Sequence, residues 1–476
     1  MLKQLTKQEF ERRAARSSRV AVFKEFLADR ETPVAALSRL DDKEECFLLE
    51  SITGGEIRGR YSYLGIDPCD RVEGADALDE LRARFAGYGY EPAPELPTMQ
   101  GGAVGYISYD AAAIFEPSVG LTPESSTPTM SFMICDTILI FDNVLGTVTI
   151  AVIADTAADG AYEEAMRKIA CVYERMLSAE SIAKAASAHA GSGERARRSS
   201  QFVSEMSREE FGQMVAKCKE AIRSGEVIQI VPSQKFTAES DVSDLALYRA
   251  LRLVNPSPYN FFMRFGGRTL IGSSPEELVK LSGRAASTAP IAGTRPRGET
   301  PSRDAELERE LKADEKENAE HVMLVDLGRN DLGRVCETGS VKVESFAHVE
   351  RYSHVMHLVS CVRGTLSDDR DGFDLIRAAF PAGTLSGAPK VRAMQLIAQF
   401  EKSPRGIYGG AAGYFSLTGD MDFAIVIRTL VKEGSRLTIR AGAGIVADSD
   451  ADKDYDETLN KAKAVFEAVK FAEELS

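Results

Sequence analysis

Tryptophan is absent from this chain of 476 residues, and cysteine is scarce and scattered. The seven cysteines are odd in number and none is spaced as Cys-x-x-Cys, which argues against a disulfide framework and against a zinc knuckle. We therefore expect reduced cysteines that lie in the core of a cytoplasmic protein. They are Cys46, Cys69, Cys135, Cys171, Cys218, Cys336 and Cys361.

The chain also lacks a hydrophobic run long enough to cross a membrane. Its most apolar stretch, residues 131–154, is broken by Asp136, Asp142 and Asn143 and alternates with a period of two around a turn. This pattern favours a β-hairpin over a membrane-spanning helix. Residues 1–19 are charged and lack the apolar segment of a signal peptide. We expect a soluble, intracellular protein with no membrane partner.

Basic residues are fewer than acidic residues. The chain has 58 Lys and Arg and 72 Asp and Glu, which gives a net charge of −14. Such a chain repels phosphate backbones and anionic lipid, so a role on nucleic acid would need a local basic patch. The densest basic stretch, residues 195–198, stands among small and polar residues and is interpreted as part of a solvated linker. The sequence thus predicts no nucleic-acid partner.

The length predicts two or three domains, and a stretch of distinct amino-acid composition divides the chain into two regions. Residues 183–200 read AKAASAHAGSGERARRSS, small and polar without apolar periodicity, which is typical of a linker. This leaves an N-terminal region, 1–182, and a C-terminal region, 201–476. Strands and helices mix without a regular βαβ period, which favours the α+β class with large antiparallel sheets.

Three helices of the C-terminal region can be placed from the sequence. Ser207 and Glu210 have the spacing of a capping box and predict a helix that ends at Gly225. A charged stretch that turns apolar predicts one helix over about 301–327, and an apolar stripe predicts a last helix over about 455–475.

Acidic residues recur at the spacing of one helical turn. Glu317 and Glu320 lie three apart on the second of these helices, and Asp454 and Glu457 repeat the spacing near the start of the last. Two such pairs, if they converge, would form an oxygen-ligand site suited to Mg²⁺. From spacing alone, a pair of this kind is more often a solvated helix face.

Histidines and glycine-rich segments are open to more than one interpretation. His354 and His357 lie in an apolar segment without the Glu or Cys of a zinc site, so His357 is either a core histidine or an acid–base group. Residues 442–447 fit G-x-G-x-x-A, but the expected strand is not followed by a helix, which argues against a dinucleotide site. Gly442 and Gly444 could still let backbone N–H groups approach an anion.

Six segments of the C-terminal region resemble the chorismate-utilising enzymes, most closely the anthranilate-forming branch of that family. The resemblance covers most of residues 205–470 and implies an α+β fold whose large antiparallel sheets pack as a sandwich with flanking helices. The segments are PIAGTRPRG (290–298), AEHVMLVDLGRNDLGRV (319–335), FPAGTLSGAPK (380–390), YGGAAGYF (408–415), DFAIVIRT (422–429) and AGAGIVADSD (441–450).

The resemblance implies a role for each candidate residue. Glu320 and Glu457 would bind Mg²⁺, with Glu317 and Asp454 in contact with the ion or next to its ligands. The catalytic group would consist of His357, which assists elimination of the enolpyruvyl side chain, Glu276, which protonates the departing 4-hydroxyl, and Thr384. Residues implied to bind chorismate are Gly293, Thr294, Tyr408, Arg428, Gly442, Ala443, Gly444 and Lys461.

The implied reaction converts chorismate and ammonia into anthranilate and pyruvate. Gln229 stands where isochorismate-forming relatives carry a lysine base, and Ala292 stands where aminodeoxychorismate synthases usually carry lysine. Because no glutaminase cysteine motif is present, a separate glutamine amidotransferase subunit would supply the ammonia. Aminodeoxychorismate synthase component I and a non-catalytic tryptophan sensor are the alternatives.

The resemblance extends to segments that would bind L-tryptophan as a feedback inhibitor. Residues 48–51 read LLES and residues 59–62 read GRYS, and both resemble the tryptophan-binding part of anthranilate-forming relatives, together with NPSPYN at 255–260. The residues implied to hold the inhibitor are Ser51, Pro258, Tyr259 and Asn260.

Overall fold

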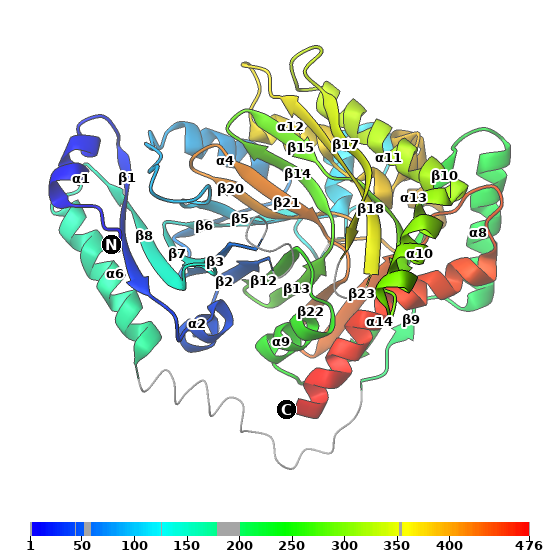
Figure 1. The fold of residues 1–476 in the computed structure, drawn as a ribbon, viewed down its shortest axis with the longest axis horizontal. Helices are drawn as coiled ribbons and strands as arrows, with labels where there is room; N and C mark the ends of the chain where they lie inside the picture. Colours follow the sequence, from blue (N-terminus) through cyan, green and yellow to red (C-terminus); the bar gives the residue numbers. More distant parts are fainter. Residues whose placement is uncertain are drawn as a thin grey trace.

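The computed structural model describes residues 2–42, 44–51, 59–124, 126–178, 200–351 and 355–475. Within these residues the chain forms two large antiparallel sheets, of eleven and ten strands, with helices around them (Figure 1). The predicted α+β class with large antiparallel sheets is therefore confirmed.

The eleven-stranded sheet, here the first sheet, takes its strands from both ends of the chain. Its inner strands are apolar on both faces, and β7 is buried at all six positions, because one face meets the other sheet and the opposite face meets helices. In spatial order it contains β1 (Arg19–Leu27), β8 (Thr147–Asp155), β7 (Thr137–Asp142), β3 (Tyr61–Ile66), β2 (Cys46–Glu50), β12 (Tyr259–Phe265), β13 (Arg268–Ser274), β22 (Thr429–Glu433), β23 (Arg436–Gly442), β11 (Ser233–Glu239) and β9 (Val203–Ser204).

The ten-stranded sheet, here the second sheet, has a long strand near one edge that pairs with three others. A separate short ladder joins β10 (Gln229–Ile230) to β19 (Gly387–Ala388). The order of the second sheet is β16 (Ile291–Pro296), β18 (Val355–Thr365), β15 (Ala285–Thr288), β14 (Glu277–Ser282), β21 (Met421–Ile425), β20 (Ala411–Ser416), β5 (Gly102–Ile107), β6 (Met130–Cys135) and β4 (Asp70–Glu73), and β17 (Lys342–Arg351) also pairs with β18.

Aromatic side chains fill the space between the two sheets. Tyr106 on β5 packs edge-to-face against Phe265 on β12, with ring centroids 5.2 Å apart. Tyr63 on β3 and Tyr414 on β20 lie 6.0 Å apart in a tilted arrangement. In each pair one ring belongs to each sheet, so these contacts form part of the core of a sandwich.

Two neighbouring segments cross from one sheet to the other. β13 of the first sheet ends at Ser274, and β14 of the second begins at Glu277. β21 of the second sheet ends at Ile425, and β22 of the first begins at Thr429. Since β13 pairs with β22 and β14 pairs with β21, the two crossings lie beside each other. The crossings carry Glu276 and Arg428, two of the candidate site residues.

The N-terminal region repeats this arrangement. β3 of the first sheet leads into β4 of the second, and β6 of the second leads into β7 of the first. β3 pairs with β7 and β4 pairs with β6, as in the C-terminal pair of crossings. The two halves therefore share one topology, although the sequence shows no internal repeat.

Helices cover the outer faces of the two sheets. In Figure 1, α6 lies along β1 and β8, α9 and α14 lie below the first sheet, and α4 and α12 lie over the second. The helices are α1 (Lys7–Ala14), α2 (Pro33–Leu40), α4 (Ala77–Ala86), α5 (Ala112–Phe115), α6 (Ala161–Leu177), α8 (Arg208–Arg223), α9 (Asp244–Val254), α10 (Pro301–Ala313), α11 (Glu315–Gly333), α12 (Gly372–Ala379), α13 (Lys390–Phe400) and α14 (Ala451–Leu475), with short 3₁₀ turns at Tyr109–Ala111, Pro117–Val119 and Gly383–Leu385.

The predicted capping box is present, whereas the predicted single helix over 301–327 is wrong. Ser207 and Glu210 cap α8 reciprocally, and α8 ends at Arg223. The second prediction fails because Asp314 is extended, with φ −73° and ψ 108°, and its carboxylate accepts the N–H groups of Lys316 and Glu317. Asp314 therefore ends α10 and acts as the N-cap of α11.

The proposed linker at 183–200 lies almost wholly outside the described residues, so the division into two regions stays a prediction. Strands from both sides of it pair directly. β2 of the N-terminal region pairs with β12 of the C-terminal region, and β5 pairs with β20. The two regions thus share both sheets.

No disulfide joins the seven cysteines, all of which the structure describes, but not all of them lie in the core. Cys69 and Cys171 are exposed, so the expectation is wrong for these two. Cys69 lies in the turn between β3 and β4, and Cys171 lies off the buried stripe of α6 that contains Ile169 and Val172. No helix within the described ranges is both long and apolar enough to cross a membrane.

Candidate active site

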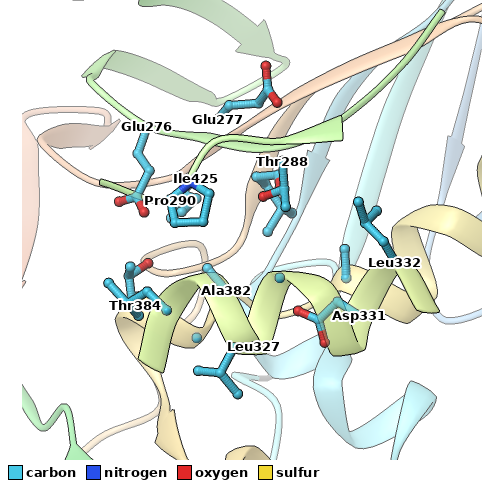
Figure 2. Close-up of a pocket in the computed structure, with 15 residues that line it drawn as sticks. Glu276, Glu277, Thr288, Pro290, Leu327, Asp331, Leu332, Ala382, Thr384 and Ile425 are labelled. Atoms are coloured by element: carbon cyan, nitrogen blue, oxygen red, sulfur yellow. The ribbon is translucent and has the colours of Figure 1, made fainter. Parts of the chain in front are cut away.

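Glu276 lies at the crossing between the sheets, with its side chain nearly sealed from solvent. Only 7% of the residue is exposed, and burial raises the pKa of its carboxyl to about 8. The Thr384 hydroxyl and the charges of Lys461 and Arg428 act in the opposite direction. Figure 2 shows the carboxyl pointing toward Thr384. A carboxyl of this kind is protonated at neutral pH and can act as an acid.

A cavity of about 40 Å³ extends from Glu276 along helix α11 (Figure 2). Asp331 also lines it, and the carboxylate of Asp331 accepts two hydrogen bonds from Lys390 Nζ, at 2.9 and 2.8 Å. Lys390 is the last residue of the FPAGTLSGAPK segment, so this ion pair fixes the segment to α11. Thr384 is thereby held on the opposite wall of the cavity from β14.

Arg428 occupies the second crossing in a left-handed backbone conformation, with φ +50°. Such a conformation costs an ordinary residue about 1–3 kcal/mol and is common at functional sites. Burial lowers the pKa of its guanidinium, while the charge of Glu276 raises it. Within the described residues no carboxylate forms an ion pair with Arg428, and its guanidinium donates one hydrogen bond, to Asn255. A charged group in this state is suited to bind an anionic ligand.

His357 lies on β18 opposite Thr294 of β16. Its Nδ1 lies 3.0 Å from the carbonyl oxygen of Gly293 and 3.0 Å from the hydroxyl of Thr294. Because the carbonyl can only accept, Nδ1 carries the proton and Nε2 carries the ring's lone pair. Burial lowers the pKa of His357, so the ring is neutral at pH 7. The bulge that places Gly293 requires φ +62°, which favours glycine.

The two acidic pairs approach each other across α11 and α14. Lys461 Nζ lies 2.7 Å from Glu457 Oε1, and the charges of both Glu457 and Glu320 raise the pKa of this half-exposed lysine. The charges of Glu320 and Glu457 thus act on the same lysine, and their role as metal ligands stays a prediction.

A divalent cation fits this acidic group. Burial and then the charge of Glu320 raise the pKa of Glu317, while burial and then the charge of Glu457 raise that of Asp454 to about 6. One buried oxygen of Asp454 has no hydrogen-bond partner among the described residues. No three carboxylate, cysteine or histidine side chains in the described ranges already stand in metal-binding geometry. The carboxylates need a counter-charge that the protein supplies only in part.

The segment 442–444 lies near Tyr408, Gln229 and Glu320. A Cβ on Gly442 would lie 3.0 Å from the Tyr408 hydroxyl, and one on Gly444 would lie 2.8 Å from Gln229 Nε2. A Cβ on Gly442 would also lie 2.7 Å from the carbonyl oxygen of Pro232, so glycine is required sterically at Gly442, whereas at Gly444 the flexible end of Gln229 could move aside. The resemblance implied that the backbone of Ala443 binds chorismate. The Ala443 N–H instead donates to the carbonyl of Pro232, so this amide is not available to a ligand. Gly442 instead accepts a hydrogen bond from Lys461.

Gln229 and Ala292, the two positions from which the resemblance favoured anthranilate formation, are both buried. The Gln229 amide donates to Glu320 Oε1 at 3.2 Å, so this side chain orients a candidate metal ligand. Ala292 is 7% exposed on β16, opposite Leu358. Neither residue can act as a base or as a nucleophile toward the substrate.

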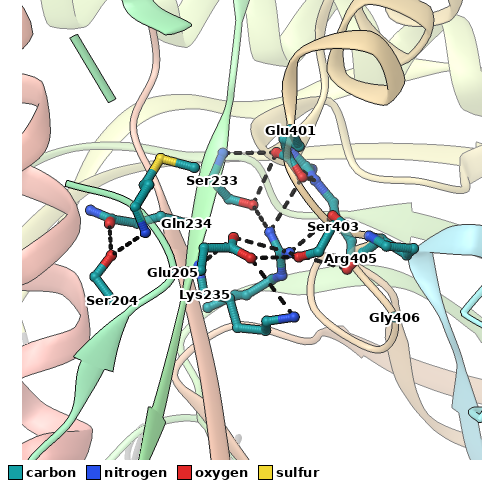
Figure 3. A network of polar contacts seen from close by, with 12 residues as sticks. Ser204, Glu205, Ser233, Gln234, Lys235, Glu401, Ser403, Arg405 and Gly406 are labelled. Carbon is teal, nitrogen blue, oxygen red and sulfur yellow. Dashed lines mark hydrogen bonds and ion pairs between the residues drawn. The ribbon is translucent and has the colours of Figure 1, made fainter. Parts of the chain in front are cut away.

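A buried network of ion pairs contacts the segment that contains Thr384 (Figure 3). The sequence did not predict this network. Arg405 and Glu401 have side chains only 1% and 4% exposed, and their closest atoms lie 2.6 Å apart. Arg405 also donates to the carbonyl oxygens of Leu385 and Val231, at 2.6 and 2.5 Å. The network thus fixes the segment after Thr384 to the strand before β11. Charged residues carry no sequence signal for complete burial.

The residues implied to bind tryptophan lie near one end of the β2–β12 ladder. Asn260 is paired with Glu50, so Ser51 follows directly beyond the last pair, on the Tyr259 side. The Tyr259 hydroxyl donates to Glu277, and the Asn260 amide donates to the carbonyl of Ser257 at 2.5 Å. Pro258 is buried beside them. Residues 52–58, between the LLES and GRYS segments, lie outside the described residues.

Comparison with known proteins identifies the class. The chorismate binding enzyme family matches residues 44–467, and the chain belongs to this family. It is 44% identical to anthranilate synthase component 1 of Streptomyces coelicolor over 95% of this chain and 89% of that protein, and 40% identical to that of Pseudomonas aeruginosa over 99% of both. The structure is similar to anthranilate synthase component I from Streptococcus pneumoniae, with a TM-score of 0.77, 35% identity and coverage of 93% and 99%.

Proposed function

We propose that this chain converts chorismate and ammonia into anthranilate, pyruvate and water. The observation that carries the proposal is a protonated, buried Glu276 near Arg428, a cation that forms no ion pair with a carboxylate among the described residues. Chorismate carries two carboxylates and a 4-hydroxyl that must leave, so it needs a cation and an acid close together. The names of relatives at 40–44% identity support the same reaction.

In the first step, ammonia forms a bond to C2 of the ring and the 4-hydroxyl leaves as water. Glu276 supplies the proton that the hydroxyl takes with it, since its raised pKa keeps it protonated at neutral pH. Arg428 holds a carboxylate of the substrate during this step. Thr384 lies next to the Glu276 carboxyl and lines the same cavity, with its hydroxyl unpartnered among the described residues.

In the second step, C2 loses its proton and the enolpyruvyl side chain leaves as pyruvate, which makes the ring aromatic. His357 is neutral, and its Nδ1–H donates to the carbonyl of Gly293. In this tautomer the lone pair is on Nε2, the atom through which such a histidine accepts a proton. Thr294 and Gly293 fix the orientation of this ring.

Glu320 and Glu457 would hold a magnesium ion, with Glu317 and Asp454 beside it. The ion would supply a Lewis acid for the ring carboxylate of the substrate. Lys461, Tyr408 and the backbone at Gly442 and Gly444 would complete the binding surface.

The same proposal includes partners. A glutamine amidotransferase subunit supplies ammonia, and L-tryptophan binds at Ser51, Pro258, Tyr259 and Asn260 as a feedback inhibitor. The protein acts in the cytoplasm. Each of these rests on the family and on the residues that match its motifs.

The test is product identification. Purified chain, chorismate, an ammonium salt and Mg²⁺ should yield the fluorescence of anthranilate and an equal amount of pyruvate. Mass spectrometry distinguishes the alternatives: a 4-amino product that keeps its side chain would indicate an aminodeoxychorismate synthase. Intact chorismate together with bound tryptophan would indicate a sensor. Either result would contradict the proposal.

A further inference from the structure

Arg428 and Asn255 are joined through a closed ring of three hydrogen bonds with Ser273. Arg428 Nη1 donates to Asn255 Oδ1 at 3.2 Å, and Asn255 Nδ2 donates to the carbonyl of Ser273 at 3.2 Å. The N–H of Ser273 in turn donates to the carbonyl of Arg428 at 3.3 Å. The ring ties the side chain of Arg428 to its own backbone, so one rotamer is selected.

We propose that Asn255 is a positioning residue for substrate binding, which aims the Arg428 guanidinium at a substrate carboxylate without neutralising its charge. The proposal rests on the proposed function, because it takes Arg428 to be the group that holds the substrate. It adds a residue that no sequence motif for chorismate binding contains, since Asn255 belongs to the segment expected to serve tryptophan.

The chemistry of the acceptor supports this role. Buried arginines elsewhere in this fold are held by carboxylates: Arg405 by Glu401, and Arg264 by Asp41 at 2.6 Å. A carboxylate at position 255 would satisfy Arg428 and cancel the charge that attracts a dianionic substrate. An amide oxygen orients the guanidinium and leaves its charge in place, and the other N–H groups remain for bidentate binding.

Asn255 is itself held rigidly. It is the C-cap of α9, and its N–H donates to the carbonyl of Leu251 at 2.8 Å. Its carbonyl lies within hydrogen-bond distance of the hydroxyl groups of Ser273 and Ser257. The amide therefore has few rotamers to lose when it holds the arginine, which lowers the entropic cost of orientation.

The test measures KM and kcat for Asn255→Ala, with chorismate binding by calorimetry. We expect the KM to rise about 10-fold while kcat stays within about 2-fold, because a misplaced guanidinium weakens binding of substrate and transition state alike. Asn255→Asp keeps the acceptor but adds charge, and its KM should also rise. The control is Asn330→Ala, which changes an exposed asparagine of α11 and should leave both parameters unchanged.

A double-mutant cycle separates positioning from loss of folding. In an Arg428→Ala background, Asn255→Ala should change chorismate affinity no further, since its effect acts through the arginine. Additive losses, or a fall in kcat at constant KM, would overturn the assignment while leaving the reaction in place. A wild-type chain that neither binds nor converts chorismate would overturn the proposed function and this assignment together.

Discussion

Glu276 and Arg428 lie on the two neighbouring crossings between the sheets, and the charge of each shifts the pKa of the other. Each crossing joins the end of a strand in one sheet to the start of a strand in the other, between Ser274 and Glu277 and between Ile425 and Thr429. The fold thus places a buried acid near a partly buried cation, where charges interact more strongly than in bulk water.

Replacement of Glu276 by glutamine removes the proposed acid. We expect Glu276→Gln to lower kcat by roughly 100- to 10,000-fold, the usual contribution of a general acid. In the wild type, kcat/KM should fall as the pH rises through about 8, because the carboxyl loses its proton there. The residual activity of the variant should lack this alkaline limb.

Glu277→Gln is the matched control for that experiment. Glu277 lines the same cavity, but its carboxylate accepts a hydrogen bond from the hydroxyl of Tyr259. Its loss should leave the alkaline limb near pH 8 in place. If the alkaline limb disappeared in Glu277→Gln and persisted in Glu276→Gln, the assignment of Glu276 as the acid would be wrong.

Thermal stability should depend on pH through the same group. The pKa of Glu276 is about 8 in the folded chain, above its ordinary value of 4.5, so the folded state binds the proton more tightly than the unfolded state does. Wild-type stability should therefore decrease as the pH rises from about 4.5 to about 8. Since Gln cannot ionise, the Tm of Glu276→Gln relative to wild type should increase over this range. A difference that does not vary with pH would contradict the raised pKa.

Local sequence predicted much of the fold and the chemical groups of the site. The capping box of Ser207 and Glu210 is a short-range pattern, as is the pairing of Glu317 with Glu320, and both could be seen in the sequence. Strand alternation and glycine-rich turns likewise indicated large antiparallel sheets. These features depend on residues a few positions apart.

Contacts between residues that are far apart in the sequence, and the burial of charged residues, could not be predicted from local patterns. The hydrogen bond between Asn255 and Arg428 joins residues 173 positions apart. The buried pair of Arg405 and Glu401 looks, in sequence, like any solvated i,i+4 pair. Asp314 stands within a run of charged residues. In such a run an aspartate that caps a new helix cannot be distinguished by sequence from an aspartate on the exposed face of a continuous helix.

Loss of the proposed magnesium ligands should abolish binding of the ion. We expect Glu320→Ala and Glu457→Ala to remove Mg²⁺ binding measured by calorimetry, and to remove activity. Glu317→Gln and Asp454→Asn should weaken binding by about 10- to 100-fold, as residues beside metal ligands usually do. Glu315→Ala, an exposed residue of the same helix, is the control. Unchanged Mg²⁺ affinity in Glu320→Ala would place the ion elsewhere.

The network behind the site should contribute strongly to folding stability. Arg405→Met leaves Glu401 buried with a weaker partner, Arg440 at 3.4 Å, and should cost about 3–5 kcal/mol in the free energy of unfolding. The double replacement Arg405→Met with Glu401→Leu removes both charges and should recover part of this loss. Urea denaturation measures both variants. A double variant no more stable than Arg405→Met would show that the penalty does not come from the uncompensated carboxylate.

The chain contains no tryptophan, so the fluorescence of added L-tryptophan reports its own binding without background from protein indoles. We expect a saturable spectral shift when tryptophan binds beside Ser51 and Tyr259. Ser51→Phe should abolish the shift by filling the site, while Ser302→Phe, at an exposed serine of α10, should preserve it. Because Ser273 also bonds both Asn260 and Asn255, tryptophan should raise the KM for chorismate in the wild type and have less effect in Asn255→Ala. A shift that survives Ser51→Phe would place the inhibitor away from the β2–β12 ladder.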